Sequence, residues 1–381
     1  MRKILLILST IIIIIFSIYF IWFIPNYSQI KRNSKKNIVE KIQPSLIETK
    51  IASMTLRQKI SCLLILQSSD TENLIQFLND YQPSGLIFMQ ENINSKTSIE
   101  ISEITKSLQN NPDFPYLFAI DQEGGTVKRL SEDTFASAYD LKNQTTEATR
   151  SAFYDRSMIL KKAGLNLNFG IVADVTENTS SFIYPRVFGG DPYDVAKKVS
   201  SAIDGEKGNV LSTLKHYPGH GETTADSHYQ LPETDISYKD WQTKDEIPFV
   251  SGIRNGAQFI MFGHLIYSSI DSEPASLSKT WHEILRERDK FKGIIITDDM
   301  AMLQQSGDIN YRDPVKNAVK AINVGNTMLL YILGSNDITT NNLIDGIVNA
   351  VNEGEIEINL IDTNVKQILE LRNSLSSIIT K

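Results

Sequence analysis

The chain has 381 residues, of which 41% are hydrophobic and 22% charged, and its formal net charge is -7. This composition is typical of a globular protein, and the excess of acidic side chains argues against a nucleic-acid partner. Cys62 is the single cysteine, which excludes an intrachain disulfide and a cysteine-based metal cluster. Because Cys62 lies in an apolar run, we expect a buried thiol rather than a nucleophile.

The N-terminal residues 4–24 form one apolar run. At about 1.5 Å per residue it is long enough to cross a hydrocarbon core of about 30 Å. Trp22 and Tyr27 lie near its far end, where interfacial aromatic residues are expected. The run is longer than a usual signal-peptide core and no small-residue cleavage site follows it. We therefore predict a signal anchor over residues 1–27, with a cleaved signal peptide as the alternative.

The rest of the chain divides into a linker and one folded domain. Residues 28–45 are polar and rich in Lys and Asn, which is typical of a linker. No later change in composition marks a second domain, so residues 46–381 are predicted to form one unit, ending in a helix over 359–381. One α/β barrel of roughly 200 to 400 residues is large enough to include all of it.

Short apolar runs alternate with longer helix-like stretches from residue 46 onward. The candidate strands are 62–66, 85–89, 116–120, 165–172, 211–214, 259–262, 293–297 and 327–333. Helix-like segments lie between them, such as 98–108, 147–163 and 191–205. Near-continuous apolar runs are typical of parallel strands covered on both faces. The pattern predicts an α/β fold, a (β/α)8 TIM-type barrel, with a doubly wound open sheet as the alternative.

Polar residues at the ends of five successive strands favour the barrel. They are Asp121 to Gly125, Asp174, Lys215 with His216, His264, and Asp298 with Asp299. In a barrel the carboxyl ends of all strands converge on one mouth, where the active sites of this fold lie. In an open sheet they would be spread along an edge at about 4.8 Å per strand.

The stretch KHYPGHGETTADSH, residues 215–228, contains three of the five histidines. Its proline and glycines exclude a regular helix, so it is predicted to be an active-site loop. Asp226 is placed to hydrogen-bond the ring of His228, which would orient the imidazole for proton transfer.

Asp298 follows the apolar strand 293–297 and precedes a second acid, Asp299. Adjacent side chains point to different sides, so one carboxylate is expected to cap the next helix while the other faces the cavity. A carboxylate in the mouth and a separate proton donor on a loop supply the two roles that a retaining glycosidase needs.

Asp121 and Arg129 flank a Gly124-Gly125 turn and are predicted either to hold sugar hydroxyls or to form a structural salt bridge. A metal site formed by His216, His220, His228 and His264 is the alternative for the histidines. Their irregular spacing argues against it, and no metal or other cofactor is predicted. His282 follows Trp281 in a helix-like stretch and is expected at the surface.

The motifs KHYPGHGETTADSH, AIDQEGGTVKRL and GIIITDDMAM resemble those of the β-N-acetylhexosaminidases of glycoside hydrolase family 3. The segment FGHLIYSSID followed by SEPASLS supports the same resemblance, which runs from about residue 56 to residue 334. The resemblance implies a (β/α)8 barrel that carries the whole active site. It also implies a retaining mechanism through a covalent glycosyl-enzyme intermediate.

By this resemblance Asp298 corresponds to the nucleophile and His228 to the general acid/base, with Asp226 as its partner. The implied sugar-binding residues are Asp121, Arg129, Arg186, Lys215 and His216. The implied substrates are β-linked N-acetylglucosaminides, muropeptides among them. A β-glucosidase, a glycoside phosphorylase and a catalytically inactive carbohydrate-binding barrel are the alternatives.

The expected location combines the apolar run with the implied substrate. Four basic residues between 31 and 36 follow the run, and a strict positive-inside count would leave the domain in the cytoplasm. A cell-wall substrate favours the opposite orientation. We therefore expect a single-pass protein of the cell membrane with its catalytic domain outside the cytoplasm.

Overall fold

The computed structural model describes residues 45–67, 73–111, 113–332 and 340–379. The chain divides into two compact units, residues 1–53 and 54–381. Within the first unit the described element is helix α2 (Leu46–Ser53). The predicted anchor over 1–27 and all but the last residue of the predicted linker lie outside the described residues, so these bounds stay predictions.

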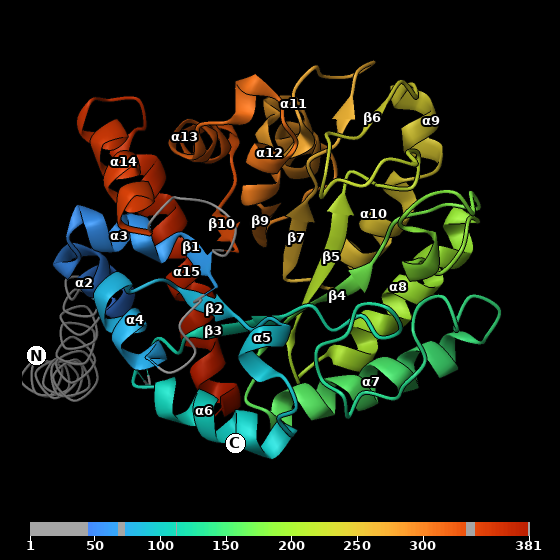
Figure 1. Ribbon diagram of the computed structural model, residues 1–381, viewed down its shortest axis with the longest axis horizontal. Coiled ribbons are helices and arrows are strands. Elements are labelled where there is room, and N and C mark those ends of the chain that lie inside the picture. The colour runs from blue at the N-terminus through green and yellow to red at the C-terminus, as the bar shows by residue number, and fades with distance from the viewer. Residues whose placement is uncertain (1–44, 68–72, 112, 333–339, 380–381) are drawn as a thin grey trace, which may run out of the picture. The chain divides into compact units, whose positions relative to one another are not determined.

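Eight parallel strands form a closed barrel in the second unit (Figure 1). The strands are β1 (Leu64–Leu66), β2 (Gly85–Ile87), β3 (Leu117–Ile120), β4 (Leu167–Val172), β5 (Leu211–Tyr217), β7 (Phe259–Phe262), β9 (Ile294–Asp299) and β10 (Met328–Tyr331). They follow one another around the barrel in chain order, and β1 pairs with both β2 and β10. This closure confirms the predicted barrel and excludes the open sheet.

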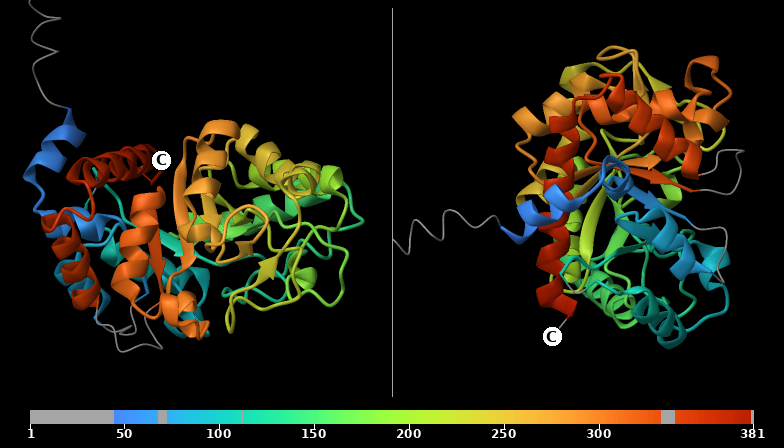
Figure 2. Two further views of the ribbon diagram at one scale, coloured as in Figure 1. Left: turned by 90° about the horizontal axis from the view of Figure 1, so that it is seen from above. Right: turned by 90° about the vertical axis from the view of Figure 1, so that its left-hand side faces the viewer.

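Helices surround the barrel and cover the outer face of its strands (Figure 1). They are α3 (Leu56–Cys62), α4 (Leu74–Tyr81), α5 (Gln90–Ile93), α6 (Ser98–Leu108), α7 (Thr146–Lys162), α8 (Pro192–Glu206), α9 (Tyr238–Thr243), α10 (Glu246–Arg254), α11 (Lys279–Glu283), α12 (Ala301–Gln305), α13 (Pro314–Val324), α14 (Thr340–Asn352) and α15 (Ile358–Ile379). Several begin directly after a side chain that accepts a hydrogen bond from the first turn: Thr97, Thr145, Asp191 and Asp313. Both α14 and α15 pack against α3, so the C-terminal helices complete the ring beside the first strand (Figure 2).

The strand β5 extends further than its hydrophobicity predicted. The apolar run ends at Leu214, but the strand continues through Lys215 and His216 to Tyr217, and all three side chains are buried. A strand predicted from hydrophobicity ends before Lys215, because a charged side chain is buried only where partners compensate its charge. A two-stranded sheet of β6 (Glu233–Thr234) and β8 (Ile266–Tyr267) was also not predicted.

The prediction of a membrane-spanning protein is wrong for the part of the chain that the structure describes. In those ranges no helix has the length and hydropathy that crossing a membrane requires. The longest described helix, α15, carries Asp362, Lys366, Glu370 and Arg372, because it covers a barrel and also faces solvent. The apolar run 4–24, on which the prediction depended, lies outside the described residues.

His282 was expected at the surface and is instead buried. Its Nδ1 donates to the carbonyl oxygen of Ser278 at 2.7 Å, and its ring stacks on Phe262 with 4.2 Å between centroids. The polarity of His282 predicted exposure, but the helix that carries it packs against β7 and buries its side chain. Cys62 is buried, as predicted.

A buried ion pair braces the loop that follows β3. The Arg156 Nε of α7 lies 2.6 Å from an Asp133 carboxylate oxygen, and both side chains are 0–1% exposed. Gln122 donates to the same carboxylate at 2.7 Å, and its own amide oxygen accepts the backbone N–H of Arg129 at 2.9 Å. The ion pair thus fixes the backbone on which Asp121 and Arg129 are carried.

Arg156→Ala is expected to lower the free energy of unfolding by about 3–5 kcal/mol, because it leaves the Asp133 carboxylate buried without its cation. Urea unfolding followed by circular dichroism measures the change. Arg150→Ala is the matched control on the same helix, since Arg150 pairs with Glu147 in solvent and its removal should leave the unfolding midpoint nearly unchanged. Equal midpoints for the two variants would contradict the assigned role of the buried pair.

Candidate active site

The polar residues predicted at the strand ends meet at the carboxyl end of the barrel. Lys215 of β5 contacts Asp121, which directly follows β3. His216 of β5 contacts Asp174, which lies beyond the end of β4. The Nε2 of His264, beyond β7, donates a hydrogen bond to the backbone oxygen of Asp299 in β9, at 2.9 Å. Five successive strands therefore contribute to one site.

The Lys215 ammonium lies at the centre of this site, and its side chain is only 3% exposed. Its Nζ is 2.8 Å from Asp121 Oδ1 and 2.7 Å from Glu123 Oε1. Burial acts to lower the pKa of Lys215, but the two carboxylates outweigh it and raise the pKa above its usual range. Lys215 is therefore a permanent cation that connects the ends of β3 and β5.

Glu123 joins Lys215 to Arg186, which lies in the short helix η1 (Tyr184–Arg186) after β4. The Arg186 guanidinium donates to both Glu123 oxygens, at 2.9 and 2.7 Å. Burial would raise the pKa of Glu123, but Arg186 and Lys215 overcome it and hold the pKa at about 2. Sequence reasoning did not assign Glu123 a role. The signal was available, since Lys215 and Arg186 were both predicted for one site, and cations that become buried there require a second acid beside Asp121.

His216 forms a buried pair with Asp174. Its Nδ1 lies 2.8 Å from Asp174 Oδ2, and the other oxygen of Asp174 accepts the backbone N–H of His220 at 2.7 Å. Burial would raise the pKa of Asp174, yet His216 holds it below its usual range. The His216 Nε2 lies 3.3 Å from Arg186 Nη2, and because an arginine only donates, Nε2 accepts there. Both ring nitrogens of His216 are thus occupied.

The two adjacent acids of β9 have different environments. Asp299 accepts the backbone N–H groups of Ala301 and Ile332 at 3.0 and 2.9 Å, so it caps the turn into α12. Burial and the neighbouring Asp298 charge raise the pKa of Asp299 to about 7. Burial would also raise the pKa of Asp298, but His216, His264 and Lys215 together lower it. Asp298 is therefore the ionised carboxylate of the pair.

Asp226 and His228 form the pair that the sequence predicted, on the loop after β5. The His228 Nδ1 and backbone N–H lie 2.6 and 3.0 Å from the same Asp226 oxygen. The side chain of His228 is 56% exposed and that of Asp226 is 35% exposed. The pair of His216 and Asp174, in contrast, is buried. Partial burial acts to raise the pKa of Asp226, and the two hydrogen bonds from His228 lower it.

Asp121 and Arg129 form an ion pair, with 3.6 Å between Arg129 Nη2 and Asp121 Oδ2. The side chain of Arg129 is 22% exposed and that of Asp121 is 17% exposed. The salt bridge therefore exists without closing the pair to solvent.

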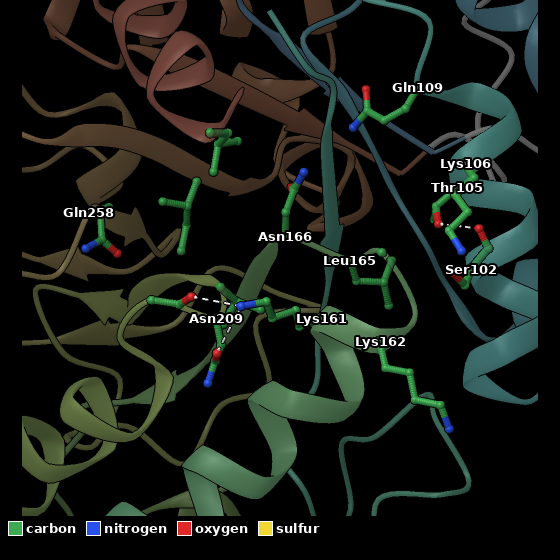
Figure 3. Close-up of a pocket in the computed structure, with 15 residues that line it drawn as sticks. Ser102, Thr105, Lys106, Gln109, Lys161, Lys162, Leu165, Asn166, Asn209 and Gln258 are labelled. Carbon is green, nitrogen blue, oxygen red and sulfur yellow. Dashed lines mark hydrogen bonds between the residues drawn. The ribbon is translucent and has the colours of Figure 1, made fainter. Parts of the chain in front are cut away.

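Across the described ranges, no group of three His, Cys, Asp or Glu side chains is arranged to hold a metal ion. A separate cavity of about 590 Å³ lies at the opposite, amino-terminal ends of β4, β5 and β7 (Figure 3). Its lining includes Lys161, Asn166, Asn209 and Gln258 and contains no carboxylate or imidazole. It lacks the acid and nucleophile of a glycosidase, so the candidate active site is the mouth around Lys215.

Glu123→Gln is expected to remove a contribution to stability that depends on pH in a defined direction. A carboxyl group with a pKa of about 2 when folded and 4.5 otherwise stabilises the fold above pH 4.5. That contribution, on the order of 3 kcal/mol, is lost as the pH falls from 4.5 toward 2. Urea unfolding at several pH values should show wild type and variant converging in this window. A constant difference between them would contradict the ionised state of Glu123.

Known proteins similar to this chain have related descriptions. The family model described as "Glycosyl hydrolase family 3 N terminal domain" matches residues 55–371. A protein of the fungus Arthroderma benhamiae, described as an uncharacterized secreted glycosyl hydrolase, is 30% identical over 80% of this chain and 89% of its own length. A β-hexosaminidase of Tolumonas auensis is 32% identical over 65% of this chain and 74% of its own length.

A solved structure has the same fold. The glycoside hydrolase family 3 β-N-acetylglucosaminidase of a Paenibacillus species aligns with a TM-score of 0.76 at 25% identity. The alignment covers 85% of this chain and 63% of that protein. Together with the family match over most of the sequence, these similarities establish that the chain is a glycoside hydrolase and belongs to glycoside hydrolase family 3.

Proposed function

We propose that the protein is a retaining exo-β-N-acetylglucosaminidase in which Asp298 is the nucleophile and His228 the acid/base. The observation that carries the proposal is the state of Asp298. This carboxylate is kept ionised by His216, His264 and Lys215, while a separate imidazole, that of His228, lies on the partly exposed loop after β5. A nucleophile that attacks carbon must be deprotonated, and the group that protonates the leaving oxygen must be a different one.

The first step forms a covalent bond between an Asp298 oxygen and the anomeric carbon. The bond from that carbon to the glycosidic oxygen breaks as His228 transfers its proton to the oxygen. Asp226 holds the His228 ring through Nδ1 and stabilises the imidazolium. In the second step His228 removes a proton from water, whose oxygen attacks the same carbon and releases Asp298. Two displacements retain the β configuration.

The charged network around Lys215 is proposed to bind the sugar. Asp121 and Arg129 keep exposed polar atoms at the mouth, and Lys215, His216 and Arg186 are held rigidly behind them. Side chains fixed by buried ion pairs lose little freedom on binding, which favours precise recognition of hydroxyl groups.

The substrate class follows from the relatives. Proteins named β-hexosaminidase and β-N-acetylglucosaminidase are among those similar to this chain, so we assign terminal β-linked N-acetylglucosamine as the substrate, including muropeptide fragments of peptidoglycan. A phosphorylase is the second candidate. An imidazole donor carries no negative charge, so it would not repel phosphate as an acceptor in the way that a carboxylate would.

Wild-type protein is expected to release N-acetylglucosamine from 4-nitrophenyl β-N-acetylglucosaminide, and Asp298→Ala to lose nearly all of this activity, since the covalent step requires the carboxylate. Asp299→Ala is a control for the neighbouring acid and should affect stability more than turnover. Release of nitrophenol measures the rate.

Three further arms of the same assay separate the alternatives. Faster cleavage of 4-nitrophenyl β-glucoside would make the protein a β-glucosidase. Appearance of sugar 1-phosphate in phosphate buffer would make it a phosphorylase, and loss of activity with a chelator would indicate a metal. Binding of N-acetylglucosamine without turnover of any of these substrates would make the protein a catalytically inactive carbohydrate-binding barrel.

The muropeptide assignment has its own measurement. Digestion of purified peptidoglycan fragments with a non-reducing terminal N-acetylglucosamine should yield the free sugar, detected by mass spectrometry. Cleavage of chitin-derived disaccharide at a measurable rate, with no sugar released from the peptidoglycan fragments, would restrict the substrate to other N-acetylglucosaminides.

A further inference from the structure

The acid/base pair does not fix its own position in the barrel. Asp226 and His228 are two residues apart on one loop, so their hydrogen bonds orient the ring only with respect to that loop. Residues 218–232, all of which are described, form neither helix nor strand between β5 and β6. Asp298 belongs to the barrel itself. A contact between the loop and the barrel is needed to set the distance between proton donor and nucleophile.

Phe182 supplies such a contact to the imidazole. It lies in the loop between β4 and α8, where it packs against the buried cluster of Val172, Ile183 and Val187. Its ring meets that of His228 edge to face, with 6.0 Å between centroids and an interplanar angle of 87°. The ring is therefore anchored in the barrel and presented to the loop.

The surroundings of Phe182 are fixed. His220 meets the Phe182 ring with 4.7 Å between centroids, and the backbone N–H of His220 is held by the buried Asp174. The Arg186 guanidinium, itself held by Glu123, lies 5.6 Å from the ring centroid. The preceding residue, Ser181, donates from its hydroxyl to the carbonyl oxygen of Thr223 at 2.8 Å, which secures the loop at a second point.

We propose that Phe182 is a positioning residue for His228: its ring is the surface on which the acid/base imidazole is seated for proton transfer to the leaving group. This inference rests on the proposed function, since it takes His228 as the proton donor. No assignment made by sequence reasoning includes Phe182.

An aromatic ring suits this task better than a polar group. Asp226 already occupies Nδ1 of His228, so Nε2 is the nitrogen that must face the glycosidic oxygen. A hydrogen-bond partner placed to hold the ring through Nε2 would compete with that oxygen. An edge-to-face contact fixes the plane of the imidazole and leaves Nε2 to the substrate.

The test uses leaving groups that differ in their need for a proton. Wild type, Phe182→Ala, Phe182→Tyr and His228→Ala are compared on 2,4-dinitrophenyl β-N-acetylglucosaminide and on N,N′-diacetylchitobiose. The parameter is kcat/KM, which reports steps up to formation of the glycosyl-enzyme. Dinitrophenolate leaves without protonation. The leaving group of the disaccharide is a second sugar, whose glycosidic oxygen must be protonated as the bond breaks.

Phe182→Ala is expected to lose roughly 10- to 100-fold in kcat/KM on the disaccharide and only about 2-fold on the dinitrophenyl substrate, since a small misplacement of a catalytic group costs up to this much. His228→Ala should show the same selectivity to a larger degree. Phe182→Tyr, which keeps the ring, should remain near wild type. Tyr184→Ala is the matched control, because this aromatic residue of the same loop contacts Tyr139 and Lys142 instead.

Each result decides between two ideas. Equal losses on both substrates in Phe182→Ala, or equal selectivity in Tyr184→Ala, would overturn the positioning role and leave the proposed function intact. A wild-type protein inactive on both substrates would overturn the proposed function and this inference with it. If Phe182→Ala fails to fold by circular dichroism, Phe182→Leu, which keeps the apolar volume, serves in the same comparison.

Discussion

The buried ammonium of Lys215 is the constraint on which the site depends. A cation inside a barrel strand is tolerated only with compensating charge, and Asp121 and Glu123 supply it at 2.8 and 2.7 Å. Two carboxylates around one cation leave an excess of negative charge, which Arg186 balances. The ends of β3 and β5 and the loop after β4 are thereby joined by alternating charges. Removal of any one of them would leave the remaining charges unbalanced, so the arrangement holds as a unit.

Lys215 also acts, together with His216 and His264, on which of two adjacent acids is ionised. Asp298 and Asp299 have the same chemistry and neighbouring positions, and burial penalises both. His216, His264 and Lys215 act on Asp298, whereas the backbone N–H groups that donate to Asp299 do not offset its burial and the charge of Asp298. The pKa of the first is therefore lowered and that of the second raised to about 7. The network proposed to bind the sugar thus also acts on the carboxylate proposed as the nucleophile.

The parts of this structure that sequence could predict are those set by local pattern. The eight strands were predictable because parallel strands buried on both faces are apolar runs, and the Asp226–His228 pair because its members are two residues apart. The end of β5 was not, because Lys215 and His216 are buried only through partners elsewhere in the chain. Glu123 and Arg186 are 63 residues apart, and no spacing rule connects them. His282 was misplaced for the same reason, since its surroundings come from β7.

Two Asp–His pairs lie in the part of the chain that the structure describes, and because their environments differ, proton transfer is proposed for only one of them. In the pair of Asp174 and His216, both ring nitrogens are engaged, one by the carboxylate and one by Arg186, and the group is buried. A proton on such a ring cannot pass to a substrate, because both nitrogens already have hydrogen-bond partners. In the pair of Asp226 and His228 the carboxylate engages one nitrogen, and the imidazole is 56% exposed. A retaining glycosidase must give a proton to a leaving group and take one from water at the same position. That exchange requires contact with solvent and with substrate, which a fully satisfied, buried imidazole cannot provide.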